Sequence, residues 1–346
     1  MRLRFFLNLK VQKEIIKKLN FSLTNDQIKT LNEINNDLAS STKMFRLLQG
    51  DVGSGKTIVS LLAAFNTINS NFQVAFMAPT EILAKQHYNL AKKIFPNQLE
   101  IEIISGKSNY KDKKEILKKL YKKEIDIIFG THAIFQNKVE FNNLGLIIID
   151  EQHKFGVNQR KRLSDKGGDN CDILLMTATP IPRTLQFSLM GARDLSIINT
   201  PPPNRQPVLT EIVTFNEEML RDTISYEVSR GGQVFFVNNR IANIKEIAGM
   251  IQRLCPGVKV GIGHGQMDGK VLERNMMDFI EGKYDVLIAT TIIESGIDIS
   301  NANTIIINDA QNFGLSDLHQ LRGRVGRSNK KGFCYLIAPK TTVLTS

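Results

Sequence analysis

The chain has 346 residues, of which 42% are hydrophobic and 23% charged. At roughly 100–200 residues per domain this length predicts two domains, each large enough to bury its own core. The net charge of +11 favours a polyanionic partner such as nucleic acid, although a composition rich in Lys, Ile and Asn gives the same charge without one. No apolar run approaches the roughly 18 residues of a membrane span, so no membrane partner is expected.

The three cysteines and residues 1–20 indicate in which cellular compartment the protein is expected. Cys171, Cys255 and Cys334 are far apart in the sequence and lack the spacing of metal ligands. We expect them to pack as reduced, apolar side chains in a cytoplasmic protein. The apolar patch within residues 1–10 is too short for a secretory signal, and residues 1–20 are expected to form a helical lead-in.

Short apolar runs alternate with helical patterns through the first half of the chain. The runs expected to be buried strands are 73–79, 125–131, 144–150 and 172–179, and helical patterns at 57–68 and 81–94 lie among them. Such alternation predicts a mainly parallel sheet with helices on both faces. Residues 107–123 carry eight lysines, and we interpret them as a solvated face of one amphipathic helix.

A proline cluster then separates two α/β lobes. Four prolines within residues 197–208 cannot continue a helix or a central strand, which predicts a stiff linker. The alternation restarts after them, with strands expected at 233–239, 258–264, 284–291, 302–310 and 333–339. We therefore predict an α/β fold with a first lobe over residues 21–196 and a second over 209–346.

A glycine-rich stretch in the first lobe predicts a phosphate site. Residues 46–57 read RLLQGDVGSGKT, between an apolar run and a helical pattern. Glycines let backbone N–H groups turn onto phosphate oxygens, and the start of a helix adds partial positive charge. Lys56 can then reach the β- and γ-phosphates of a nucleotide, and the Thr57 hydroxyl can bind Mg²⁺.

The run at 144–150 ends in a carboxylate pair. Ligands of open parallel sheets gather beyond the carboxyl ends of the strands. Asp150 can hold Mg²⁺ there, and Glu151 can position and activate an attacking water. Alone, such a pair is usually a capped strand end, but beside the glycine-rich loop it indicates catalysis. The amide of Gln27 can both donate to and accept from an adenine edge, although an isolated glutamine is ordinarily a surface residue.

The second lobe contributes arginines. Residues 317–328 place Arg322, Arg324 and Arg327 around two glycines, and the guanidinium fork matches phosphate oxygens. The first lobe has no obvious arginine for the γ-phosphate, so we predict an arginine finger that makes hydrolysis depend on closure of the lobes. The alternative is a basic turn that faces nucleic acid or solvent.

Small, hydroxyl-bearing and histidine residues follow several predicted strands, where they can track nucleic-acid phosphates. Each is a weak signal by itself. We interpret the five histidines as lying at strand ends or in these clusters, along the edge of a cleft; they are His87, His132, His153, His264 and His319.

The central stretch LLMTATPIPRTL is predicted to couple the lobes. Thr177 and Thr179 should lie beside the Asp150–Glu151 strand end, where their hydroxyls can bond the carboxylates. Pro180 and Pro182 would stiffen the exit from this strand, so a change at the nucleotide would reach the second lobe.

Together these stretches resemble a known family. GDVGSGKT, APTEILAKQ, GTH, DEQH, TAT, GHGQM, TTIIESGID and QLRGRVGR occur in the order and spacing of superfamily 2 helicases, and most resemble the RecG/Mfd branch of bacterial double-stranded DNA translocases. The resemblance covers essentially the whole chain. It implies two tandem RecA-like P-loop lobes, ATP and Mg²⁺ as cofactors, hydrolysis of ATP between the lobes, and double-stranded or branched DNA as the partner of a monomer.

The resemblance also implies roles for individual residues. Glu151 would be the catalytic acid/base residue, with Lys56, Asp150, Arg324 and Arg327 completing the catalytic set. The nucleotide would be held by Gln27, Gly50, Gly53, Ser54, Gly55, Lys56, Thr57, Asp298 and Gln320, and the metal by Thr57 and Asp150. The DNA backbone would meet Pro79, Thr80, Thr131, His132, His264 and Thr290.

Two departures from the family leave alternatives open. Relatives carry domains before the helicase lobes and a coupling helical hairpin after the arginines, so we interpret the chain as a fragment of a longer protein. The first half looks closer to RecG and the second to Mfd, which suggests a mosaic joined near residues 175–186, either a natural recombinant or an assembly artefact. The role is then that of a RecG-like recombination and repair translocase, an Mfd-like factor with stalled RNA polymerase as partner, or a nucleotide-gated DNA-binding module without translocation.

Overall fold

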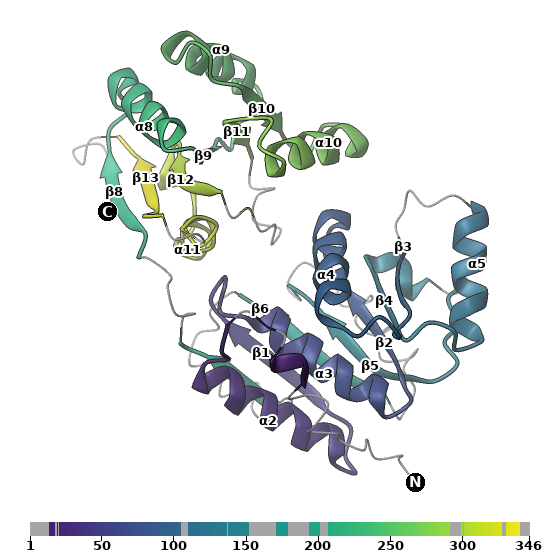
Figure 1. The fold of residues 1–346 in the computed structure, drawn as a ribbon. Helices are drawn as coiled ribbons and strands as arrows, with labels where there is room; N and C mark the ends of the chain where they lie inside the picture. The colour runs from purple at the N-terminus through teal and green to yellow at the C-terminus, as the bar shows by residue number, and fades with distance from the viewer. Residues whose placement is uncertain are drawn as a thin grey trace. The chain divides into compact units, whose positions relative to one another are not determined.

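The computed structural model describes residues 14–17, 19, 21–104, 110–136, 138–151, 171–178, 194–200, 207–290, 299, 301–326 and 330–339. Contacts within the chain divide it into two compact units, Met1–Pro202 and Pro203–Ser346, which are described separately (Figure 1). The boundary between the units lies among the prolines that follow β7.

Unit 1 is built on a seven-stranded parallel sheet. Its strand order is β3-β4-β2-β5-β6-β1-β7. The strands are β1 Phe45–Gly50, β2 Gln73–Met77, β3 Ile101–Ile104, β4 Ile127–Gly130, β5 Leu144–Ile149, β6 Asp172–Thr177 and β7 Asp194–Ile198. β5 therefore lies beside β2 although two α-helices, two strands and a 3-10 turn separate them in the sequence. This pairing brings the end of β5 next to the end of β2.

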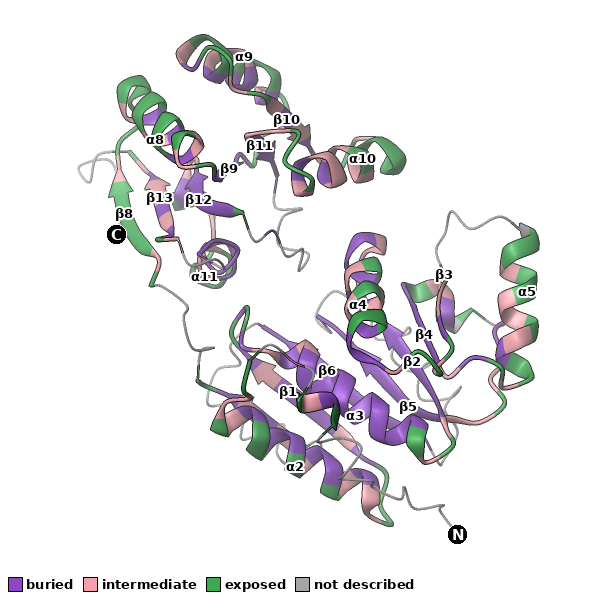
Figure 2. Cartoon of the chain, in the orientation of Figure 1, coloured by how far each residue is buried: buried purple, intermediate pink, exposed green. Residues whose placement is uncertain are grey.

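Helices cover both faces of this sheet. They are α2 Asn25–Ala39, α3 Lys56–Asn69, α4 Glu81–Ile94 and α5 Tyr110–Tyr121, with the 3-10 turn η1 His132–Phe135. In β5, Leu146 and Ile148 pack in one apolar cluster with α2, α3 and α4, whereas Ile147 and Ile149 pack in another that includes residues of α5. Because side chains alternate along a strand, both faces of the sheet are buried (Figure 2).

Unit 2 repeats this plan with six parallel strands in the order β10-β11-β9-β12-β13-β8. The strands are β8 Leu209–Val213, β9 Gln233–Val237, β10 Val260–Gly263, β11 Val286–Ala289, β12 Ala302–Ile307 and β13 Phe333–Ile337. The helices are α8 Glu217–Ser229, α9 Ile244–Leu254, α10 Gly269–Ile280 and α11 Leu315–Arg322, with the 3-10 turn η4 Ala310–Asn312. The predicted pair of parallel α/β sheets with helices is confirmed.

One buried glutamine in each unit makes equivalent hydrogen bonds at the start of a central strand. Gln73 opens β2, and its Nε2 donates to the carbonyl oxygens of Leu120 and Ile125, both at 2.9 Å. Gln233 opens β9, and its Nε2 donates in the same way to the carbonyl oxygens of Phe279 and Tyr284, both at 2.7 Å. In both units a buried amide thus fixes the loop between a helix and the next strand.

The predicted strand positions are confirmed, but the strands end earlier than the apolar runs. The run at 144–150 becomes β5 with Asp150 just beyond it, and the run at 125–131 becomes β4 with Thr131 just beyond it. Three strands were not predicted, namely β3, β7 and β8. All three are edge strands in which polar residues interrupt the apolar run, namely Glu102 in β3, Ser196 in β7, and Thr210 and Glu211 in β8.

The structure also shows the surroundings of the lysine-rich stretch and of the three cysteines. Residues 110–121 of the lysine-rich stretch form α5, whose Leu120 is buried while Lys119 pairs with Glu115 at the surface. The three cysteines are free and buried, as expected. Among the described residues, no helix is long and apolar enough to cross a membrane, and no group of three or more His, Cys, Asp or Glu side chains could hold a metal ion.

Candidate active site

The glycine-rich loop joins β1 to α3 and has the backbone that a phosphate cradle requires. Gly53 and Gly55 have φ angles of +80° and +87°, a left-handed conformation that side chains strongly disfavour. A Cβ atom on Gly55 would lie 2.3 Å from Nε2 of Gln27, and one on Gly50 would lie 2.5 Å from Oγ of Ser54. Gly55 is therefore required by both its backbone conformation and the space around it, Gly53 by its backbone conformation and Gly50 by the space around it.

The first turn of α3 offers donors to an anion. Gly55 occupies the N-cap position, and no side chain caps the helix. The buried Oγ of Ser54 has no hydrogen-bond partner, and Nζ of Lys56 donates to the carbonyl oxygens of Gly50 at 2.6 Å and Asp51 at 3.0 Å. A lysine held at the glycine-rich loop, together with helix N–H groups that no side chain caps, suits a phosphate group.

Gln27 is part of this loop's support and is only 3% exposed, so it is not a surface residue. Its Oε1 accepts from the Thr24 N–H at 2.9 Å in a capping box at the start of α2. Its Nε2 donates to the Ser54 carbonyl oxygen at 2.8 Å. The amide thus ties α2 to the glycine-rich loop, and its contact with adenine stays a prediction.

The carboxylate pair lies at the carboxyl end of β5, as predicted. The Asp150 N–H donates to the Met77 carbonyl oxygen at 2.9 Å, which extends the pairing with β2 by one residue. Oδ1 of Asp150 accepts from the Glu151 N–H at 3.0 Å. Glu151 is 5% exposed and has a φ angle of +50°, a conformation that costs a non-glycine residue about 1 kcal/mol or more. Such strain is often stored at functional sites.

The partner of Asp150 is a histidine that sequence reasoning placed wrongly. His87 lies inside α4, not at a strand end, yet its Nε2 is 3.0 Å from Oδ2 of Asp150. The imidazole is 5% exposed and packs against the Phe76 ring with 4.7 Å between the centroids. The sequence signal was a histidine on the apolar stripe of a helix, where a leucine would satisfy packing alone.

Several opposing effects set the pKa of Asp150. Burial raises it, but the hydrogen bond and charge of His87, the positive charge of Lys56 and the Glu151 N–H together lower the pKa below its ordinary value. The carboxylate is therefore ionised at neutral pH and acts only as an acceptor, so Nε2 of His87 is the donor. Carboxylate oxygens are ligands that Mg²⁺ prefers, and Lys56, whose charge lowers the pKa of Asp150, is the first residue of α3 and precedes Thr57.

The coupling stretch meets the carboxylates through its backbone. The Ala178 N–H, just after β6, donates to Oε2 of Glu151 at 3.5 Å. Thr177 is buried at the end of the strand. This contact with Glu151 is made by a main-chain group, and the predicted contacts of the Thr177 and Thr179 hydroxyls stay a prediction. Thr179, Pro180 and Pro182 lie outside the described residues.

The residues predicted to meet DNA in unit 1 follow β2 and β4. Thr80 caps α4, since its Oγ1 accepts from the Leu83 N–H at 3.3 Å, and Pro79 precedes it half-buried. Thr131 is buried before η1, and His132 is exposed as its first residue. All four stand at the same carboxyl edge of the sheet as Asp150.

In unit 2 the corresponding edge holds the other predicted residues. The Thr290 N–H donates to the Gly263 carbonyl oxygen at 3.2 Å, so β11 and β10 end together beside His264. Nδ1 of His264 is buried and has no hydrogen-bond partner. Gln320 in α11 and Arg324 after it are buried. Asp298, Arg327 and His153 lie outside the described residues.

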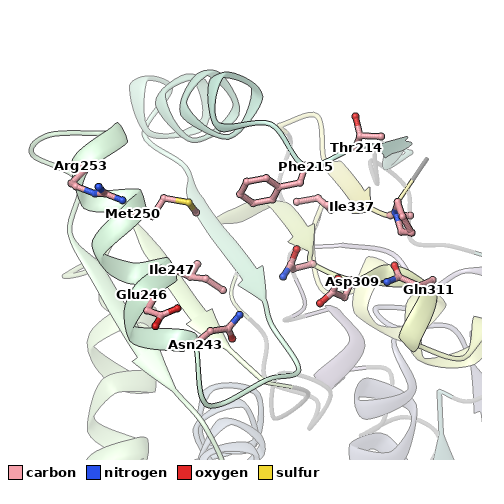
Figure 3. A pocket seen from close by; sticks show the side chains of 13 residues that line it. Thr214, Phe215, Asn243, Glu246, Ile247, Met250, Arg253, Asp309, Gln311 and Ile337 are labelled. Atoms are coloured by element: carbon pink, nitrogen blue, oxygen red, sulfur yellow. Dashed lines mark hydrogen bonds between the residues drawn. The ribbon is translucent and has the colours of Figure 1, made fainter. Parts of the chain in front are cut away.

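Unit 2 also contains a cavity of about 660 Å³ at the carboxyl ends of β8, β12 and β13 (Figure 3). Phe215, Ile247 and Met250 contribute apolar side chains, whereas Glu246 and Asp309 contribute carboxylates. None of the residues predicted to bind nucleotide or DNA lines it. Arg253 also lines the cavity, so the lining carries charges of both signs.

Comparisons with known proteins agree with this geometry. Residues 23–187 match the DEAD/DEAH box helicase family, and residues 216–329 match the helicase conserved C-terminal domain. Transcription-repair-coupling factors from Staphylococcus aureus (strain USA300) and Staphylococcus haemolyticus (strain JCSC1435) are each 45% identical over 326 residues, which is 94% of this chain. The chain spans only 28% of the length of each of these factors.

Solved structures give the same result. RecG bound to a three-way DNA junction is 39% identical, with a TM-score of 0.85, over 97% of this chain and 45% of that one. Dbp5 from S. cerevisiae, bound to RNA and ADP BeF3, is 19% identical with a TM-score of 0.67 over 95% of this chain and 89% of that one, a likeness of fold alone. The coupling factors and RecG each span both units, so these matches do not divide the chain into two parentages, and the mosaic stays a prediction.

Proposed function

Because the chain belongs to the superfamily 2 helicases, in the RecG/Mfd branch, we propose that it is an ATP-driven translocase core that acts on double-stranded or branched DNA in recombination and repair. The single observation that carries this proposal is the grouping in unit 1 of a glycine-rich loop, a helix α3 that no side chain caps, Lys56 and the buried carboxylate of Asp150. Each is needed to bind and hydrolyse a nucleoside triphosphate.

The site residues divide the chemical work. Backbone N–H groups from Gly53 to Thr57, together with Lys56, would hold the phosphates, and Gln27 would meet the adenine. Thr57 and Asp150 would hold Mg²⁺, which when bound neutralises charge that develops on the phosphate oxygens. Glu151 would orient the attacking water and take its proton. The Ala178 N–H on Oε2 helps to fix that carboxylate.

Arginines of unit 2 would complete the reaction. We assign Arg324 and Arg327 to the γ-phosphate, with Gln320 and Asp298 at the nucleotide, as the family resemblance implies. Hydrolysis would then require both units, and the Thr177–Thr179 stretch would report the state of the nucleotide.

DNA binding is proposed at the strand ends that carry Pro79, Thr80, Thr131 and His132 in unit 1 and His264 and Thr290 in unit 2. The net charge of +11 supports a contact with the phosphate backbone. Such binding is independent of base sequence and weakens steeply with salt, by about one power of salt concentration per phosphate neutralised.

The test is phosphate release with and without duplex and three-way-junction DNA. Wild type should release phosphate with Mg²⁺–ATP, and DNA should increase the rate. Lys56→Ala and Arg327→Ala should abolish release, whereas Lys122→Ala, an exposed lysine beyond α5, should leave it unchanged. Unchanged turnover in Lys56→Ala would rule out this site, and absent DNA stimulation would favour the nucleotide-gated binding module.

A second candidate rests on the 45% identity to transcription-repair-coupling factors over 94% of this chain. In that case the translocase would act on stalled RNA polymerase. Displacement of a stalled transcription complex by the chain with ATP would support this role. Unwinding of a three-way junction without displacement would favour the RecG-like role.

A further inference from the structure

The two units place counterpart residues at the same point of their sheets. In unit 1 the Asp150 N–H donates to the Met77 carbonyl oxygen, where β5 and β2 end; in unit 2 the Asn308 N–H donates to the Val237 carbonyl oxygen, where β12 and β9 end. Both distances are 2.9 Å. The residues that follow, Glu151 and Asp309, have φ angles of +50° and +52°. The pair Asn308–Asp309 is therefore the internal counterpart of Asp150–Glu151.

The side chains at these counterpart positions have different partners. Nδ2 of Asn308 donates to Oδ1 of Asn238 at 3.0 Å, so unit 2 closes this edge with two neutral amides. Unit 1 closes it with the Asp150 carboxylate and the His87 imidazole. The same backbone thus forms with an amide in place of the carboxylate and without an imidazole. The fold therefore does not require the carboxylate–imidazole pair, which points to a role for that pair in the site.

The His87 imidazole that bonds the Asp150 carboxylate is itself held in place by the packing of α4. His87 lies on the buried stripe of α4 with Leu83, Ala84 and Ala91, and its ring is packed against Phe76. Because Nε2 bonds Oδ2 while the Glu151 N–H bonds Oδ1, the Asp150 carboxylate cannot rotate without breaking one of these hydrogen bonds. Its orientation is set by α4 on one side and by the strained backbone on the other.

The same helix begins at a predicted DNA contact. Thr80 caps α4, and His87 follows two turns later. A shift of the capped end of a rigid helix moves the imidazole with it. The geometry points to His87 as a positioning residue that fixes Asp150 for the Mg²⁺-bound nucleotide and links that carboxylate to DNA bound at the start of α4. This inference rests on the proposed function and adds a residue and a route of coupling to it.

Three variants test the inference in the full chain. His87→Leu keeps the apolar packing of the stripe and removes the donor. His87→Gln restores an N–H donor near the position of Nε2. Ile94→Ala, on the same buried stripe but away from Asp150, is the matched control for lost packing. Binding of a fluorescent ADP analogue is measured by titration with Mg²⁺ and in EDTA, and the melting temperature is recorded for each variant.

In His87→Leu the Mg²⁺ concentration for half-maximal analogue binding should rise about tenfold, the usual loss when a metal ligand loses its orienting partner. Binding in EDTA should not change. His87→Gln should recover most of the Mg²⁺ response, and Ile94→Ala should melt earlier with the wild-type Mg²⁺ response. DNA stimulation of phosphate release should be lost in His87→Leu and kept in Ile94→Ala.

Other outcomes overturn the inference. A folded His87→Leu protein with the wild-type Mg²⁺ response would show that His87 only packs, and equal shifts in His87→Leu and Ile94→Ala would show the same. If wild type binds the analogue in a Mg²⁺-dependent way but releases no phosphate, the proposed function fails while the binding titration still decides the role of His87. Analogue binding by wild type that ignores Mg²⁺ would overturn the inference itself.

Discussion

Nε2 of Gln27 donates to the Ser54 carbonyl oxygen across 2.8 Å, so a residue 27 positions earlier in the chain braces the loop that would hold the phosphates. The same amide also closes the capping box of α2 through Thr24. One side chain thus joins the start of a helix to the nucleotide loop. Both the stability of unit 1 and its affinity for nucleotide should therefore depend on the Gln27 side chain.

Gln27→Ala should lower both quantities. It leaves the Thr24 N–H and the buried Ser54 carbonyl oxygen without this partner, which should lower the free energy of unfolding by about 1–3 kcal/mol. Affinity for the fluorescent ADP analogue should fall at the same time. Chemical denaturation and analogue titration measure these effects, with Asn32→Ala on the exposed side of α2 as control. A Gln27→Ala protein of wild-type stability would show that the amide does not brace the loop.

Gly55→Ala should prevent the loop from forming. The φ angle of +87° is strained for alanine, and its Cβ would meet Gln27 at 2.3 Å, so we expect a loss of more than about 1 kcal/mol and weak nucleotide binding. Gly249→Ala is the matched control because it lies inside α9 with nothing within 4 Å of a new Cβ. That control should raise stability by about 0.5–1 kcal/mol. Tight nucleotide binding by Gly55→Ala would contradict the proposed cradle.

Glu151→Gln should separate binding from hydrolysis. The substitution keeps the size of the side chain and its contact with the Ala178 N–H but removes the proton acceptor. Phosphate release should fall by about 10²–10⁴-fold, as when a general base is lost, with little change in analogue binding. Single-turnover release and equilibrium titration check the two halves of this prediction. A fall in binding equal to the fall in rate would assign Glu151 to nucleotide affinity instead.

Thr179→Ala should uncouple the two activities. We expect basal phosphate release to remain while stimulation by duplex DNA is lost, because this stretch is proposed to report the nucleotide state to unit 2. Phosphate release over a DNA titration is the measurement. Full stimulation of Thr179→Ala by DNA would remove the coupling role from this residue.

The thiol of Cys334 should resist alkylation in the folded protein. Burial raises its pKa from 9.0 to about 12, against a smaller lowering by Arg322. Since the folded pKa exceeds the unfolded one, this cysteine's contribution to stability is fully present below pH 9.0 and is lost as the pH rises toward 12. Iodoacetamide at pH 9 should label Cys334 only after denaturant is added, as mass spectrometry would show. Labelling at equal rates with and without denaturant would contradict its burial.

Local patterns in the sequence were enough to predict the central strands of both sheets and the glycine-rich loop. The central strands carry continuous apolar runs because both their faces are buried, and the glycine-rich loop needs its residue types at fixed spacing, so each can be found from neighbours in the sequence. The edge strands β3, β7 and β8 were not predicted because polar residues such as Glu102, Ser196 and Glu211 interrupt their apolar runs. The left-handed backbone at Gly53 and Gly55 follows from the same local requirement.

The sequence by itself therefore determined two parallel α/β sheets, the phosphate loop and the carboxylate pair at the end of β5. Only the tertiary structure decided what supports them. The pairing of β5 with β2 and the packing of α4 bring His87 to Asp150 across 63 positions of sequence, and α2 brings Gln27 to Ser54. No local pattern encodes these contacts, because they depend on the order in which strands join the sheet and on which face each helix covers.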